Sequence, residues 1–150
     1  MNQKKVILLV EDNPDDEALT IRALKKNNIL NEVIVARDGA EALDLLFGDS
    51  DDPDAKLSVY PELVLLDLNL PKISGHEVLK RIRSNEKTRM LPVVVLTTSN
   101  EDKDRMDSYE LGVNSYIRKP VDFRQFSDSI LQVGVYWLVL NEGPPFMKKS

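Results

Sequence analysis

Hydrophobic residues gather in five short runs, separated by stretches in which they recur at the spacing of an α-helix. The runs at 6–10, 63–66 and 93–96 are apolar throughout, which is typical of strands covered on both faces in a parallel sheet. Two further runs, at 33–36 and 115–117, complete the set. This alternation predicts an α/β fold, a (βα)5 doubly wound parallel five-stranded sheet with right-handed crossovers.

Capping signals mark the ends of several predicted helices. Pro14 suits the first position of a helix, and Asp122 is a suitable N-cap for the last one. Ser74 and Glu77 have the spacing of a capping box at the start of the third helix. Gly112 is expected to end the fourth, because glycine readily adopts the left-handed conformation found just past a helix C-terminus.

The composition is that of a globular domain and excludes several kinds of protein. The 150 residues carry 20 basic and 25 acidic side chains, and the resulting charge of −5 disfavours binding to nucleic acid. The absence of cysteine excludes disulfide bonds and a thiolate nucleophile, and it agrees with a reducing cytoplasm. The N-terminus lacks the pattern of a secretion signal, and the apolar runs are too short to span a membrane. We therefore expect a cytoplasmic protein without a membrane segment.

Polar residues that could carry chemistry stand where the predicted strands end. Glu11 and Asp12 follow the first strand, Asp67 follows the third, Thr97 ends the fourth and Lys119 follows the fifth. Ligands of open parallel sheets bind outside the carboxyl ends of the strands. Any one of these residues could be an ordinary turn or capping residue. Together they predict a functional site of three carboxylates, a hydroxyl and an ammonium group.

Four motifs, in this order, resemble the response-regulator receiver family over roughly residues 5–141. They are Val-Glu-Asp-Asn at 10–13, Leu-Leu-Asp-Leu-Asn-Leu-Pro at 65–71 with Gly75 following, Leu-Thr-Thr-Ser at 96–99, and Tyr-Ile-Arg-Lys-Pro at 116–120. Each motif alone is weak evidence for the family, whereas all four in this order and at these separations are specific to it. The resemblance implies the flavodoxin-like strand order 2-1-3-4-5.

The resemblance also implies a phosphoacceptor and a metal site. Asp67 would accept the phosphoryl group, and Mg2+ would bind Asp12, Asp67 and the backbone carbonyl of Asn69, with Glu11 acting through water. A metal site is consistent with these residue types, because Mg2+ prefers oxygen ligands. A divalent cation would also relieve the repulsion between carboxylates that lie close together. The implied ligand set for Mg2+ is therefore Glu11, Asp12, Asp67 and Asn69.

Two further residues are implied to contact the phosphoryl group, and one to respond to it. Lys119 and the Thr97 hydroxyl would each meet a phosphoryl oxygen and offset its charge. Tyr116, three positions before the lysine, would turn inward as a switch, although a half-buried tyrosine also simply suits a strand. The Lys119-Pro120 bond is cis in the family, whereas most X-Pro bonds are trans, so its state stays open.

The implied organisation is a receiver domain over 1–141 with an extended last helix, a tail over 142–150 and no output domain. Such a protein would act by protein contact, with a sensor histidine kinase or a phosphotransfer protein as its partner, and would not be a turnover enzyme. A haloacid-dehalogenase-like phosphatase uses a similar set but needs an acid where this chain has Asn69. A pseudo-receiver that is never phosphorylated is disfavoured, since every acceptor-site residue is present.

The last predicted helix ends in residues 135–140, which are apolar all round. A helix apolar on every side must be buried on every side. This stretch could form the interface of a homodimer, or it could fold back onto its own domain. Together with the long acidic connection at 49–61, it resembles the small stand-alone receivers that serve phytochrome-type histidine kinases.

Four other polar residues have less distinctive surroundings. His76, the only histidine, is interpreted as a solvent-facing helix residue rather than a phosphate donor or metal ligand, because no second ligand lies near it in the pattern. Asp15, Asp16 and Glu17 are interpreted as acids that complement the N-terminus of the first helix.

Overall fold

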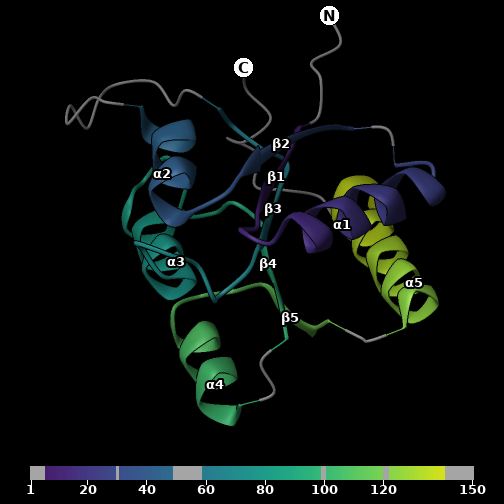
Figure 1. Ribbon diagram of the computed structural model, residues 1–150. Coiled ribbons are helices and arrows are strands. Elements are labelled where there is room, and N and C mark those ends of the chain that lie inside the picture. The colour runs from purple at the N-terminus through teal and green to yellow at the C-terminus, as the bar shows by residue number, and fades with distance from the viewer. Residues whose placement is uncertain (1–5, 30, 49–58, 99–100, 120–121, 141–150) are drawn as a thin grey trace, which may run out of the picture.

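The computed structural model describes residues 6–29, 31–48, 59–98, 101–119 and 122–140, with only the backbone at 139 and 140. Five parallel strands form one sheet in the order β2-β1-β3-β4-β5 (Figure 1). The strands are β1 (Val6–Val10), β2 (Glu32–Ala36), β3 (Leu63–Leu66), β4 (Val93–Thr97) and β5 (Ser115–Arg118). The predicted fold class and strand order are confirmed.

Helices alternate with the strands along the chain. They are α1 (Pro14–Lys26), α2 (Gly39–Phe47), α3 (Gly75–Ser84), α4 (Asp102–Glu110), α5 (Phe123–Gly134) and a π-helical extension η1 (Val135–Leu140). In Figure 1, α1 and α5 lie together on one side of the sheet, and α2 and α3 lie on the other. The sheet is therefore the middle layer of three.

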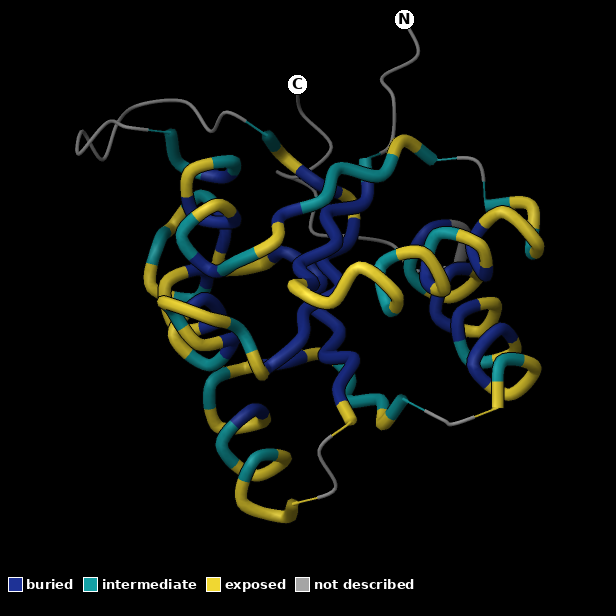
Figure 2. The backbone as a smooth tube through the Cα atoms, in the orientation of Figure 1, coloured by how far each residue is buried: buried dark blue, intermediate teal, exposed yellow. Residues whose placement is uncertain are grey.

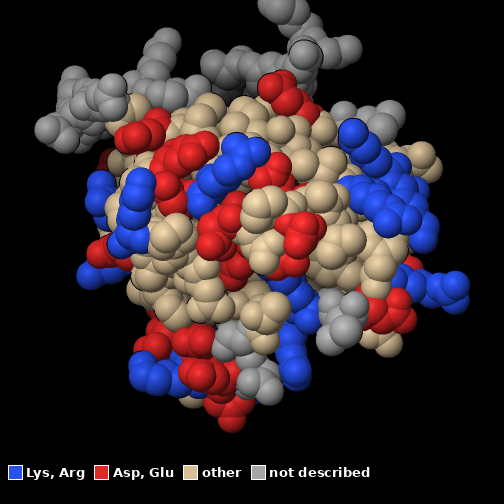
Figure 3. All heavy atoms as spheres, in the orientation of Figure 1, with Lys and Arg blue, Asp and Glu red and all other residues tan. Residues whose placement is uncertain are grey.

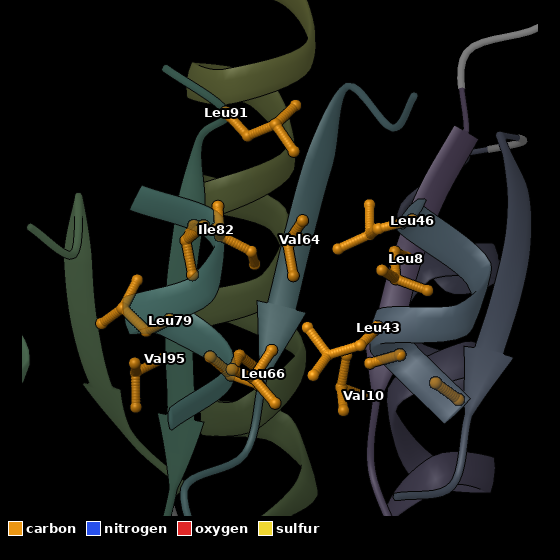
Figure 4. Packing of buried hydrophobic residues seen from close by; sticks show 14 of the residues in the cluster. Leu8, Val10, Leu43, Leu46, Val64, Leu66, Leu79, Ile82, Leu91 and Val95 are labelled. Atoms are coloured by element: carbon orange, nitrogen blue, oxygen red, sulfur yellow. The ribbon is translucent and has the colours of Figure 1, made fainter. Parts of the chain in front are cut away.

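Side chains that alternate along the strands fill two separate cores, one on each face of the sheet. Leu8, Val64 and Val95 pack with residues of α2 and α3 (Figure 4), whereas Ile7 and Leu65 pack with residues of α1 and α5. Because both faces are covered, the inner strands β1, β3 and β4 are buried along nearly their whole length (Figure 2). This explains why their sequences lack polar alternation.

The capping signals coincide with the observed helix ends. The Ser74 hydroxyl accepts a hydrogen bond from the N–H of Glu77, and the Asp122 carboxylate accepts one from the N–H of Arg124. Gly112, just past α4, has a φ of 91°, in the left-handed region that glycine adopts most easily. Local chemistry therefore determines where these helices begin and end.

The end of the last helix is not the simple α-helical extension that the sequence predicted. Residues 135–140 wind as a π-helix, which redistributes their side chains around the axis. Leu138 is buried in the core under α1 and α5, and Trp137 packs partly against it. Val135 and Tyr136 are 38% and 51% exposed. Part of the stretch thus folds back onto its own domain, and part faces outward.

Among the described residues, Ser108 is the buried residue that α4 contributes to the packing. The exposed side of this helix carries Met106 and Tyr109, which are 62% and 52% exposed.

None of the helices in the described ranges is both long and apolar enough to cross a membrane.

Gly75 begins α3 directly beneath the end of β3, where a side chain has no room. A Cβ atom there would meet the backbone carbonyl of Asp67 and the Cα atom of Leu68. We expect Gly75→Ala to lower the free energy of unfolding by about 1–3 kcal/mol, because overpacking forces the backbone to shift. Urea unfolding measures this. The exposed Lys80→Ala in the same helix should change stability by less than about 0.5 kcal/mol, and equal stability of the two variants would contradict the expectation.

Candidate functional site

Backbone hydrogen bonds between strands hold the predicted site residues at the carboxyl edge of the sheet. The N–H of Glu11 donates to the last carbonyl of β2 at 2.9 Å, and the N–H of Asp67 donates to the last carbonyl of β1 at 3.0 Å. The N–H of Lys119 donates to the carbonyl of Thr97 at 2.7 Å. Each residue thus lies one position beyond its strand yet remains tied to the neighbouring strand, so the sheet itself sets their spacing.

Three of the predicted carboxylates form one cluster. One carboxylate oxygen each of Glu11, Asp12 and Asp67 lies within 4.8 Å of the others. Glu11 and Asp67 are buried, at 2% and 8% exposure, while Asp12 is exposed. A cluster of oxygen ligands with one open side fits a hard divalent cation, which would also relieve the repulsion between these charges.

The Lys119 ammonium group lies inside this acidic site. Its Nζ atom donates to Glu11 Oε1 at 2.5 Å and to Asp67 Oδ2 at 3.3 Å. The lysine side chain is only 7% exposed. A buried ammonium group needs such partners, because burial without them would favour its neutral form.

Burial has opposite consequences for the two members of the closest pair. It raises the pKa of Glu11 to about 7, and the ammonium group of Lys119 only partly offsets this. Burial lowers the pKa of Lys119, but the hydrogen bond to Glu11 and the charge of Asp67 raise it on balance. The lysine therefore stays charged at neutral pH, while Glu11 can take up a proton there.

The β3–α3 loop orients the Asp67 carboxylate. The N–H of Asn69 donates to Asp67 Oδ1 at 3.1 Å, and the N–H of Gly75 donates to the carbonyl of Leu68 at 3.0 Å. The Asn69 side chain is exposed. With Lys119 on Oδ2, both oxygens of Asp67 have hydrogen-bond donors, so the carboxylate has a defined orientation.

Thr97 and Tyr116 lie on β4 and β5, the strands that follow β3 toward one edge of the sheet. Thr97 ends β4 and is fully buried. Its backbone carbonyl accepts the hydrogen bond from the N–H of Lys119. Tyr116 pairs with Val95 across β4 and β5, and its half-buried side chain packs against the core under α2 and α3. The structure thus brings the predicted carboxylates and Lys119 together, with Thr97 at the end of the adjoining strand β4 and Tyr116 in the core beside it.

Asp16 is a site residue that the sequence pattern did not reveal. It lies in the first turn of α1, as interpreted, but its carboxylate Oδ2 also accepts a hydrogen bond from Lys119 Nζ at 3.0 Å. Glu17 faces elsewhere and pairs with Arg37 at 3.1 Å. Spacing alone could not separate these acids, because the position of α1 against the sheet decides which one reaches the lysine.

The solvent-facing interpretation of His76 is wrong. The residue is half-buried, and its Nε2 atom lies 3.3 Å from the Ser108 hydroxyl and 3.4 Å from the carbonyl of Asp104. It therefore links α3 to α4. The reason is that α4 packs beside the first turn of α3, a tertiary contact that the helical pattern does not encode.

Some predicted features lie outside the described residues. They are the Lys119-Pro120 bond, residues 49–58 of the acidic connection, and the tail at 142–150.

Figure 3 shows acidic side chains gathered near the centre of the viewed face, and basic side chains over α1 to the right.

Comparisons with known proteins agree with this site. Residues 7–131 match the response regulator receiver domain family, and the chain belongs to it. The probable methanogenesis regulatory protein FilR2 of Methanothrix harundinacea is 41% identical over 139 residues, which cover 93% of this chain and 87% of that protein. Response regulator Rcp1 of Synechocystis is 42% identical over 137 residues, or 91% of each chain.

Solved structures of relatives share the fold. The phosphorylated cyanobacterial phytochrome response regulator RcpA superposes with a TM-score of 0.84 at 39% identity, covering 95% of this chain and 99% of that one. The Mn2+-bound form of Rcp1 gives 0.82 at 41% identity, covering 93% and 99%. The chain is therefore a signalling module of two-component systems, which interacts with a histidine kinase or a phosphotransfer protein. Its acidic cluster suits a divalent metal ion.

Proton binding and metal binding should compete at Glu11. Its pKa of about 7 means that the carboxylate holds a proton below neutral pH, and a metal ligand must lose that proton. We expect the affinity for Mn2+ to be about ten-fold weaker at pH 6 than at pH 8, because protons fill the site as pH falls through 7. Calorimetric titration measures this.

Glu11→Gln provides the control for this pH dependence. Glutamine has no carboxyl group to titrate, so the variant should bind Mn2+ weakly and almost equally at the two pH values. Equal Mn2+ affinity of the wild-type protein at pH 6 and pH 8 would remove Glu11 from the ligands.

Proposed function

We propose that Asp67 accepts a phosphoryl group from the phosphohistidine of a sensor histidine kinase or phosphotransfer protein. The observation that supports this most directly is the arrangement around its carboxylate. The Lys119 ammonium group contacts Oδ2, the N–H of Asn69 contacts Oδ1, and the carboxylates of Glu11 and Asp12 lie close by. A nucleophilic oxygen, a fixed cation and a cluster of oxygen ligands are the groups that phosphoryl transfer requires.

The proposed reaction forms an aspartyl phosphate. An oxygen of Asp67 bonds to phosphorus as the bond from phosphorus to the histidine nitrogen breaks, and the imidazole leaves. Lys119 and the Thr97 hydroxyl each meet a phosphoryl oxygen and offset its negative charge. The same groups support slow hydrolysis of the product, so we propose a self-catalysed acceptor and not a turnover enzyme. Asn69, two residues past the nucleophile, offers no acid for fast turnover.

We assign Mg2+ to the acidic cluster, with ligands from Asp12, Asp67 and the Asn69 carbonyl and with Glu11 acting through water. Magnesium uses one or two carboxylates with several waters and phosphate oxygens, which suits this sparse set of ligands. When bound, the cation supplies positive charge for the transferring phosphoryl group. The burial that raises the pKa of Glu11 supports the assignment, because a cation would stabilise the ionised form.

Tyr116 is proposed as the residue that carries the signal outward. It lies on β5, three residues before Lys119, and its side chain is half-buried. Phosphorylation would draw the Thr97 hydroxyl toward Asp67 and leave space for the tyrosine ring. Such a step would convert a local change in charge into a change of surface.

The receiver unit is proposed to span 1–141, to act in the cytoplasm and to signal by contact with proteins rather than nucleic acid. The net charge of −5 supports contact with proteins rather than nucleic acid. The likeness to the phytochrome response regulator RcpA supports a phytochrome-type kinase as the phosphoryl donor.

A homodimer through the last helix is also proposed. Leu131 and Val135 lie four residues apart, and they are 37% and 38% exposed. The adjoining Tyr136 is 51% exposed, and its ring packs edge-on against Trp137. These side chains form an apolar surface beside the part of η1 that folds inward. A symmetric pairing is the most common way to cover such a surface.

Asp67→Asn should abolish phosphorylation, because it removes the nucleophilic oxygen while keeping the size and the acceptor of the side chain. Incubation with acetyl phosphate and Mg2+, followed by intact-mass measurement, detects the phosphoryl group. Asp44→Asn, an exposed carboxylate on α2, is the matched control and should gain the mass as the wild-type protein does. A mass gain in Asp67→Asn at the wild-type rate would show that the acceptor lies elsewhere.

Tyr136→Lys should release monomers, because it places a charge in the proposed dimer interface. Sedimentation at micromolar concentration is expected to show a dimer for the wild-type protein. Gln125→Lys adds the same charge at an exposed polar position near the start of α5, far from Tyr136 along the helix, and should leave the dimer intact. A wild-type protein that sediments as a monomer, phosphorylated or not, would end the dimer hypothesis.

A further inference from the structure

The ammonium group of Lys119 has three hydrogen-bond donors, and the structure provides one carboxylate for each. Its acceptors are Glu11 Oε1 at 2.5 Å, Asp16 Oδ2 at 3.0 Å and Asp67 Oδ2 at 3.3 Å. A lysine side chain is long and flexible, so several contacts are needed to hold its charge at one point. Loss of any one acceptor leaves this ammonium group less firmly placed.

The three acceptors differ in what else they can bind. Glu11 and Asp67 belong to the cluster whose oxygens lie together within 4.8 Å, whereas Asp16 is outside that cluster. A divalent cation in the cluster would compete with Lys119 for the charge of the Glu11 and Asp67 carboxylates. Asp16 is then the carboxylate that continues to hold the ammonium group.

Asp16 lies in a capped helix turn that is anchored to the core. Its N–H, with that of Asp15, donates to the capping Asn13 side chain, and its carbonyl accepts from the Thr20 hydroxyl at 2.8 Å. Further along α1, Ala23 and Leu24 are buried in the core. The Asp16 side chain is 31% exposed, so its pair with Lys119 is partly shielded from water. Such a carboxylate approaches the lysine from a direction set by the whole helix.

We propose that Asp16 is a positioning residue for Lys119, which keeps the ammonium group beside Asp67 when a cation occupies the acidic cluster. The proposal rests on the function proposed above for Lys119 and Asp67. It assigns to α1 an indirect part in phosphoryl transfer, through a carboxylate that acts by way of Lys119. The first turn of α1 therefore sets how well the site stabilises the transferring charge.

A different role for Asp16 would be to stabilise the positive end of the α1 dipole. Asp15 offers the means to separate the two, because it is exposed in the same turn and carries the same charge. In the described part of the chain its carboxylate is in no ion pair closer than 4.0 Å. Asp15→Ala and Asp16→Ala therefore remove equal charge from the same helix end, and only the second removes a partner of Lys119.

The first test observes the ammonium group itself. Lysine N–H protons exchange rapidly with water unless hydrogen bonds hold them, so a 1H–15N signal from the Lys119 side chain reports its contacts; its loss in Lys119→Arg assigns it. With Mg2+ present, Asp16→Ala should lose this signal. Asp15→Ala and Asp16→Asn should keep it, because the asparagine oxygen still accepts a hydrogen bond.

The second test measures phosphorylation by acetyl phosphate. Asp16→Ala should react about ten-fold more slowly than Asp15→Ala, in line with the loss of one hydrogen bond to a charged group. Asp16→Asn should recover most of the rate.

The results distinguish the proposal from the function on which it rests. Equal rates and equal Lys119 signals in Asp15→Ala and Asp16→Ala would overturn the positioning role. A wild-type protein that gains no phosphoryl mass would overturn the proposed function, while the ammonium signal would still decide whether Asp16 holds Lys119.

Discussion

The ion pairing between the Lys119 ammonium group and the carboxylates around it is the interaction on which the site depends. Glu11 and Asp67 are buried at the edge of the sheet, where unpaired charges are costly. Lys119 offsets that cost, and the carboxylates in turn keep the lysine charged. Because the balance is incomplete, the pKa of Glu11 stays near 7. The site is thus prepared for additional positive charge.

The fold separates this group of buried charges from the apolar cores that stabilise the chain. The two cores lie on the faces of the sheet and are filled by apolar side chains of strands and helices. The acidic residues lie beyond the strand ends, held there by backbone hydrogen bonds to neighbouring strands. Charge can therefore change at the edge while the cores remain packed. Such separation suits a protein whose signal is a transferable phosphoryl group.

The helices around the sheet are attached unequally. Helix α5 buries Phe126, Ile130 and Val133, whereas Ser108 is the buried residue of α4 among those described. The His76 side chain supplies a polar link between α3 and α4. A helix with few buried contacts can shift at lower cost than one anchored by large apolar side chains. Among the described helices, α4 is therefore held less firmly than α5.

The sequence by itself determined the sheet, the helix ends and most of the site, because these depend on burial over short segments and on the meeting of parallel strand ends at one edge. Only the tertiary structure decided the partners of Asp16 and His76, since these depend on how α1 and α4 pack against other elements. The same holds for η1, where a π-helix replaces the 3.6-residue period and turns Leu138 inward while Tyr136 remains exposed. Local patterns encode which residues can be buried; the packing of distant segments decides which of them meet.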